Sequence, residues 1–200
     1  MITQINRMRK KLSELADIHI GQPIRDKINN LVDGKFYIIQ MKDVGRESGV
    51  NITTLYKTNL KGRVGLRLVK KGDLLFVPRV FRESLPYSVI VDVDLPNLIV
   101  APTFYVITVD QSQVKTEYLN WFINSELHGG KFFRRNALGS SVLNIPKSVL
   151  NELEVIVPPL KEQEKLVKVI HGAREEKKIM FGLVQKRVAL MDKAINQYLQ

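Results

Sequence analysis

Basic side chains in turns are the residues whose types and spacing most clearly indicate chemistry. Lys42 and Arg46 follow one apolar run, and Arg79 and Arg82 follow another. An arginine can donate two parallel hydrogen bonds to a guanine, and lysines and hydroxyl groups bind phosphates. Any one such residue is typical of a solvated surface, so the prediction depends on the whole set. The expected DNA contacts are Lys42, Arg46, Arg63, Arg79, Arg82, Lys131, Arg134, Arg135, Ser140 and Ser141.

The overall charge favours a polyanionic partner. The 200 residues include 31 Lys and Arg against 20 Asp and Glu, which gives a formal charge of +11. Such an excess indicates partners and not fold, and nucleic acid is the leading candidate. The first residues carry charges where a signal peptide needs an apolar run, and no apolar stretch approaches about 18 residues. We therefore expect a soluble, cytoplasmic protein with no membrane partner.

Neither a catalytic site nor a metal site is expected. The chain has no cysteine, which excludes a disulfide, a thiolate metal site and a thiol nucleophile, and its three histidines are far apart in sequence. It contains no phosphate-binding loop and no serine nucleophile elbow. Asp92 and Asp94 alternate along a predicted strand, which is typical of a solvated face. A small Mg²⁺-dependent nuclease that uses these two aspartates remains an alternative.

The first 158 residues predict one α+β domain. Alternating and β-branched apolar runs indicate strands at 36–41, 64–69, 74–77, 89–93 and 104–109, with a last one at 153–157. A first helix is expected to begin at an N-cap at Thr116 and to be interrupted at Gly129 and Gly130. A second, basic helix is expected from there to near Gly139, and a short third helix over 146–152. Because strands come first and helices later, we expect short twisted strands with a few helices and no doubly wound sheet.

Residues 159–200 predict a single long helix. They contain no proline after Pro159, and apolar side chains recur in steps of three and four, with one stutter between Val184 and Val188. This stripe consists of Ile170, Ala173, Lys177, Met180, Val184, Val188, Met191, Ile195 and Tyr198. A continuous helix would be about 58 Å long, with a kink allowed at Gly172 or Gly182. Such a helix needs a partner helix, and we expect an antiparallel coiled coil.

Particular strings resemble a known family. The string of Gly139, Ser140 and Ser141 leads to Ile145, a short helix, a strand that ends in Pro158, Pro159 and Leu160, and then Glu162 and Gln163. It resembles the end of a target-recognition domain in the specificity (S) subunit of type I restriction–modification enzymes. Residues 12–18 with Gly21, 38–44 and 72–76 look like that domain's opening and internal strands. The resemblance covers nearly the whole chain.

The resemblance implies a non-catalytic function. The family's S subunit recognises a two-part DNA sequence and docks modification subunits, which use S-adenosylmethionine to methylate adenine. A restriction subunit that uses ATP and Mg²⁺ joins some of these assemblies, and no cofactor is implied for this chain.

A typical member has two recognition domains and two long conserved helices, whereas this sequence has one of each. We therefore expect a half-length S subunit that forms a homodimer through the helix and recognises a palindromic, bipartite double-stranded site. Two alternatives are a coiled-coil adaptor whose charge serves only solubility and a partial S chain that works beside a full-length S subunit.

Overall fold

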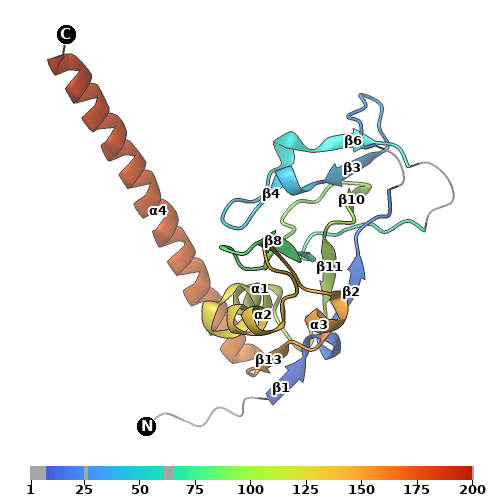
Figure 1. Ribbon diagram of the computed structural model, residues 1–200. Helices are drawn as coiled ribbons and strands as arrows, with labels where there is room; N and C mark the ends of the chain where they lie inside the picture. The colour runs from blue at the N-terminus through green and yellow to red at the C-terminus, as the bar shows by residue number, and fades with distance from the viewer. Residues whose placement is uncertain (1–7, 25–26, 61–64, 200) are drawn as a thin grey trace, which may run out of the picture. The chain divides into compact units, whose positions relative to one another are not determined.

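The computed structural model describes residues 8–24, 27–60 and 65–199, and it divides the chain into two compact units (Figure 1). One unit contains residues 1–160 and the other residues 161–200. Within the described residues, no helix is both long enough and apolar enough to cross a membrane.

A four-stranded antiparallel sheet forms the centre of the first unit. Its strands, in spatial order, are β2 (Ala16–Ile20), β11 (Tyr105–Val109), β7 (Leu74–Val77) and β9 (Tyr87–Ile90). All four residues of β7 are buried, and strands flank it on both sides. The predicted strands at 74–77 and 104–109 are thus confirmed. The strand expected at 89–93 begins and ends earlier, as β9. Just after it, the Val91 amide donates a hydrogen bond to the Asp73 carbonyl at 2.9 Å.

A second sheet has three strands, and its neighbourhood corrects two predictions. It contains β10 (Leu98–Val100), β3 (Phe36–Ile39) and β6 (Tyr56–Thr58), with β10 parallel to β3. The strand predicted at 36–41 ends at Ile39, because the Asp43 carboxylate accepts the Gln40 amide proton at 2.9 Å and starts a 3₁₀ turn. The strand predicted at 64–69 is wrong for residues 65–69, which form no strand: Leu66 and Leu68 are exposed, and the Val69 amide donates a single hydrogen bond to the Leu98 carbonyl of β10 at 2.9 Å. Val64 lies outside the described residues.

Short elements lie between the strands along the chain. They are the 3₁₀ turns η1 (Leu12–Glu14), η2 (Met41–Asp43) and η3 (Ile52–Thr54) and the small hairpin of β4 (Val44–Gly45) and β5 (Gly49–Val50). The opening segment expected as one strand over 12–18 is therefore η1 followed by β2, and β1 (Met8–Lys11) precedes it.

The helices of the first unit pack against the central sheet. α1 (Thr116–Asn124) is joined to β9 through Ser88, whose hydroxyl donates to the Asn120 side chain at 2.8 Å. The two expected helix-interrupting glycines lie in a π-helical turn, η4 (Glu126–Gly130), which runs directly into α2 (Lys131–Asn136). Phe133 of α2 is fully buried and packs on Phe76 of β7, with ring centroids 5.3 Å apart. This contact fixes α2 on the sheet.

Two helix ends differ from the sequence prediction. Thr116 is the first residue of α1, and the cap residue is Lys115, because the Thr116 hydroxyl is directed to the Gly72 carbonyl at 3.4 Å. α2 ends at Asn136 and not near Gly139, since residues 138–144 close a tight turn.

The helix predicted over 146–152 and the strand predicted over 153–157 are confirmed as α3 (Lys147–Asn151) and β13 (Glu154–Val157), which pairs with β1. The ribbon of β8 (Arg79–Phe81) and β12 (Val142–Asn144) was not predicted. The second unit is a single helix, α4, which begins at the end of the first unit (Leu160–Tyr198) and runs without interruption through Gly172 and Gly182 for 39 residues. The expected α+β fold with a long C-terminal helix is confirmed.

Candidate nucleic-acid interface

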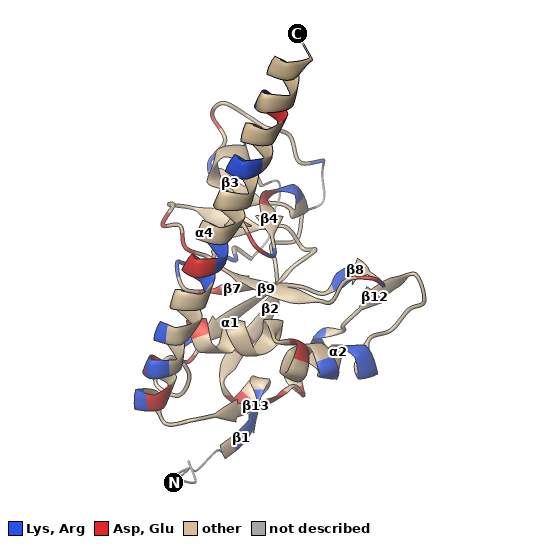
Figure 2. Ribbon diagram, turned by 90° about the vertical axis from the view of Figure 1, so that its left-hand side faces the viewer, with Lys and Arg blue, Asp and Glu red and all other residues tan. Residues whose placement is uncertain are grey.

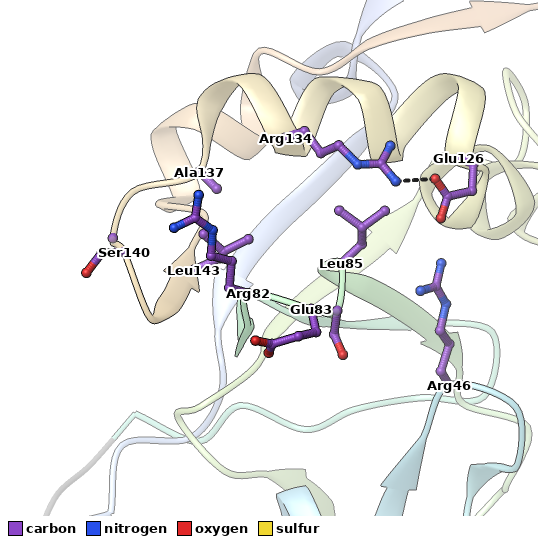
Figure 3. Close-up of a pocket in the computed structure, with 11 residues that line it drawn as sticks. Arg46, Arg82, Glu83, Leu85, Glu126, Arg134, Ala137, Ser140 and Leu143 are labelled. Carbon is purple, nitrogen blue, oxygen red and sulfur yellow. Dashed lines mark hydrogen bonds and ion pairs between the residues drawn. The ribbon is translucent and has the colours of Figure 1, made fainter.

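A basic hollow lies between the turn after β8, the turn before β12 and the η4–α2 segment (Figure 3). Its volume is about 740 Å³. Its charged and hydroxyl-bearing walls include Arg46, Arg82, Glu83, Glu126, Arg134 and Ser140. Four of the predicted DNA contacts, distant in sequence, therefore share one concave surface. They are Arg46, Arg82, Arg134 and Ser140.

The three arginines of the hollow differ in their partners. Arg134 forms an ion pair with Glu126, and the Arg46 guanidinium donates to the Asn124 carbonyl at 3.0 Å. The Arg82 guanidinium makes no hydrogen bond or ion pair to any described residue, although its backbone amide donates to the Ser141 carbonyl at 3.2 Å. Arg82 therefore has its full set of side-chain donors available for a ligand.

Arg46 also lies near Tyr87. Burial raises the pKa of the Tyr87 phenol, and the positive charge of Arg46 acts in the opposite direction. The phenol is therefore neutral at physiological pH and remains a hydrogen-bond donor.

The ribbon of β8 and β12 is the second part of the candidate interface. Arg79 pairs across the ladder with Asn144, and Phe81 pairs with Val142. The Arg79 side chain approaches the Asn144 amide oxygen at 3.4 Å. A tight turn precedes β12, in which Leu138 and Asn144 exchange two backbone hydrogen bonds of 2.9 and 2.8 Å. Ser140 and Ser141 are exposed in this turn.

Helix α2 supplies further positive charge. Lys131, Arg134 and Arg135 are all exposed on it, while Phe133 faces inward. Figure 2 shows the Lys and Arg positions of β8 and of α2 on the same side of the unit. The second basic group expected from the sequence is thus a helix surface next to the hollow.

Lys42 does not line this hollow. The Lys42 ammonium forms a 2.8 Å ion pair with the buried Asp43, donates to the Thr54 carbonyl at 2.5 Å and lies 4.0 Å from the centre of the Tyr56 ring. These contacts occupy the Lys42 ammonium group within its own domain. Arg63 lies outside the described residues.

Several residues of the interface were missed by sequence reasoning. They are Phe81, Glu83, Glu126 and Asn144. Glu83 and Glu126 are acidic, and the sequence argument for DNA contacts considered basic residues and hydroxyl groups only. The alternation of Arg79, Val80 and Phe81 could have indicated that an arginine and an aromatic share a strand face, but three residues are too few for a period-two pattern to stand out.

The second unit presents an apolar surface. Apart from Ile170, which is half-buried, every residue of the expected stripe is exposed on α4. A shallow groove follows the stripe and is lined by Ala173, Glu176, Lys177, Met180, Phe181 and Val184. We call the nine residues of the expected stripe the pairing stripe. They are Ile170, Ala173, Lys177, Met180, Val184, Val188, Met191, Ile195 and Tyr198.

No group of three or more potential metal-ligand side chains occurs among the described residues. Asp92 and Asp94, the candidate nuclease residues, are exposed in the loop after β9. What the described surface offers is a set of guanidinium, ammonium, amide and hydroxyl donors next to exposed apolar side chains. This is the chemistry that contacts DNA phosphates and base edges.

Comparison with known proteins agrees with this chemistry. Residues 6–179 match the model of the type I restriction modification DNA specificity domain. The chain therefore belongs to the family of type I restriction–modification specificity subunits. Subunits of this family recognise DNA and are not themselves catalytic. No curated protein sequence matches the chain.

Solved structures share its fold. A chain from a type I restriction–modification complex, solved to explain complex assembly and conformational transition, aligns with a TM-score of 0.66 at 16% identity, over 88% of this chain and 44% of that one. The S subunit from M. genitalium aligns at 0.55 and 15% identity, over 88% and 41%. HsdS from Thermoanaerobacter tengcongensis aligns at 0.57 and 16% identity, over 86% and 43%. The chain thus spans less than half the length of each.

Proposed function

We propose that this chain is a half-length specificity subunit that pairs with a second copy through α4 and recognises a bipartite DNA site in the cytoplasm. The observation that carries the proposal is the exposed pairing stripe, which extends along a helix about 58 Å long. Exposed apolar stripes of this length mark contact surfaces, because burying them removes apolar area from water.

Two-fold symmetry determines the form of the DNA site. If two copies pair through antiparallel α4 helices, their recognition domains are identical and related by a two-fold axis. Each domain then binds the same half-site sequence in inverted orientation, so the complete site is a palindrome with a non-specific spacer. The helix pair sets the length of that spacer.

A second set of apolar residues on α4 supports docking of the modification subunits. Ile179, Leu183 and Leu190 are exposed and, at 100° per residue, lie to one side of the pairing stripe. A two-helix coiled coil buries only the residues of its own seam. We propose that these three side chains contact the DNA adenine methyltransferase subunits, with a restriction subunit as a further partner of the assembly.

The DNA side of the proposal uses the basic surface of the first unit. Arg79, Arg82 and the α2 arginines are exposed within one region, and the two serines lie in the adjoining turn. We propose that they contact bases and phosphates together with Lys131, whereas Lys42 stabilises the local fold through its internal contacts. Arg46 lines the hollow and completes the surface.

Methylation mapping tests the whole proposal. The full chain is expressed with the matching modification subunit, and methylated adenines are located across the genome. We expect a bipartite, palindromic methylated site. An asymmetric site would show that the chain works beside a full-length S subunit, which is the second candidate function, and a complete lack of methylation would contradict DNA recognition. Cleavage by the purified chain alone would support the nuclease alternative.

Sedimentation tests the helix pairing separately. The wild-type chain is expected to be a dimer at micromolar concentration, and Val184→Glu, which places a charge in the centre of the pairing stripe, is expected to be a monomer. Gln185→Glu is the matched control, because it introduces the same charge one residue further on, outside the stripe. A monomeric wild type that is unchanged by deletion of residues 161–200 would exclude self-pairing.

A further inference from the structure

We propose that the exposed face of the β8–β12 ribbon enters the major groove, where Phe81 and Val142 contact the methyl group of a thymine and Arg79 and Asn144 bind neighbouring purines. This inference rests on the proposed DNA-binding function and names the bases that one part of the surface recognises.

The apolar half of the face is a pair of exposed side chains. Phe81 is 71% exposed and Val142 is 47% exposed, and they lie directly opposite each other in the ladder. Directly opposed side chains on one face have Cβ atoms about 5 Å apart, so the two form one patch. Phe81 therefore contributes little to the core, in contrast to Phe76 and Phe133, which are fully buried.

The polar half of the face lies two residues further along each strand. Side chains alternate between the faces of a strand, so Arg79 shares a face with Phe81, and Asn144 shares it with Val142. Arginine forms bidentate hydrogen bonds with guanine, asparagine forms them with adenine, and apolar side chains contact the thymine methyl group. The four residues thus combine the two kinds of contact that distinguish base pairs in the major groove.

The ribbon is held firmly enough to present this face in a fixed orientation. The ladder is extended at one end by the Ile145 amide, which donates to the Pro78 carbonyl at 3.0 Å. At the other end the Arg82 amide donates to the Ser141 carbonyl. On the opposite face, Val80 packs against the hydrophobic core. A two-stranded ribbon also has the width that the major groove admits.

Charge favours DNA as the occupant of this face. Arg79 and Arg82 lie in and next to the ribbon, and the exposed cations of α2 lie beside the hollow that the ribbon borders (Figure 2). Phosphates flank the major groove on both sides, so a protein that inserts a ribbon there needs positive charge beside it. The exposed apolar pair with cationic surroundings fits this requirement.

Replacement of thymine by deoxyuridine tests the inference, because it removes only the methyl group. A bipartite duplex site is first selected from a randomised library with the full-length chain. Each thymine of the selected site is then replaced singly by deoxyuridine, and affinity is measured. At one position per half-site we expect the wild type to bind the deoxyuridine duplex about fourfold more weakly than the thymine duplex, which is the difference expected for one buried methyl group. Phe81→Ala should bind the thymine and the deoxyuridine duplex with equal affinity.

Two variants control for folding and for general apolar loss. Phe81→Leu keeps an apolar side chain and is expected to retain part of the difference between thymine and deoxyuridine. Val32→Ala, at another highly exposed apolar residue outside the ribbon, should retain all of it. Because Phe81 is exposed, its variants should unfold at the same temperature as the wild type, which circular dichroism checks.

Three results would overturn the inference. They are a selected site without thymine, no thymine whose replacement matters, and a Phe81→Ala variant that still distinguishes the two duplexes. If Phe81→Ala keeps DNA recognition but loses the modification subunit, the face is a protein contact and the inference is also wrong. In each of these cases DNA binding itself persists, whereas failure of the proposed function would appear as no selectable site at all.

Discussion

Individual arginines of the interface differ in what holds them. Arg134 is paired with Glu126, Arg46 is bonded to a backbone carbonyl, and Arg82 has its guanidinium available. An exposed ion pair contributes little stability, so the Glu126 carboxylate mainly limits where the Arg134 side chain lies. A guanidinium held at one edge of the hollow suits a phosphate contact, whereas Arg79, on the same face of the ribbon as Phe81, suits a base.

Arg79 and Arg134 should therefore behave differently across a randomised DNA library. Arg134→Ala is expected to weaken binding to all sites alike and to reduce the salt dependence by about one phosphate contact. Arg79→Ala is expected to cost about 1–3 kcal/mol on the preferred site and to relax specificity at one base pair. Arg9→Ala is the control, because Arg9 forms a similar exposed ion pair, with Glu154, on the β1–β13 ladder. Uniform weakening by both variants would contradict this division.

His128 makes the stability of the first unit depend on pH. Its ring stacks on Phe122, with centroids 4.5 Å apart and an angle of 11°, and burial lowers its pKa below the ordinary 6.5. The unfolded chain therefore binds a proton first as the pH falls through 6.5, so the free energy of unfolding decreases from there downward. The melting temperature should fall between pH 7.5 and 5.5.

The substitution His128→Asn should flatten this part of the pH profile. His171→Asn, at an exposed position on α4, should leave it unchanged. A profile that is identical in the wild type and the His128 variant would assign the pH dependence to other groups.

At the scale of elements, one turn positions the ribbon. Gly139 has φ = +105°, and a Cβ atom built there would lie 2.2 Å from the Val142 carbonyl oxygen. The turn thus needs both a backbone conformation that L side chains rarely adopt and space that only glycine leaves. The start of β12, and with it the ribbon face, depends on this residue.

Gly139→Ala should therefore lower the free energy of unfolding by about 1–3 kcal/mol and weaken DNA binding. Gly49→Ala is the matched comparison, because Gly49 also has a positive φ, of +71°, but open space around its Cβ position. It should cost less stability and leave DNA affinity unchanged. Urea unfolding and titration with the selected duplex measure both quantities; equal losses in the two variants would show that the close contact with Val142 has no effect.

At the scale of the whole molecule, charge is spread over both units. Residues 161–200 contain nine Lys and Arg and five Asp and Glu, a net +4, so residues 1–160 contribute the other +7 of the +11. The positive charge therefore belongs to a folded recognition domain as much as to its helix. A dimer would carry +22, that is, twice +11.

The affinity of such a dimer for DNA should depend steeply on salt. If about ten phosphates are neutralised, the slope of log affinity against log salt is roughly −9. The monomeric Val184→Glu variant should show about half that slope, because it engages one half-site. Fluorescence anisotropy between 50 and 200 mM salt measures both values. A slope near zero for the wild type would contradict DNA binding.

Much of the fold was predictable because its signals are local. The buried run of β7, the 39-residue helix and the helix and strand after Pro146 are set by apolar periodicity and by proline. The prediction of a strand was wrong over residues 65–69, because the Arg67 amide donates to the Gln22 side chain and not to a neighbouring strand. Alternation in the sequence does not reveal such a side-chain partner.

The candidate site was predictable in residue type and not in arrangement. The sequence alone determined the basic composition, the pairing stripe and the family, since each depends on residue identity and short-range spacing. Only the tertiary structure decided that Lys42 is bonded to Asp43 and the Thr54 carbonyl, that Arg134 meets Glu126, and that Phe81 faces outward beside Val142. These outcomes depend on contacts between segments far apart in the chain, and such contacts leave no periodic pattern in either segment.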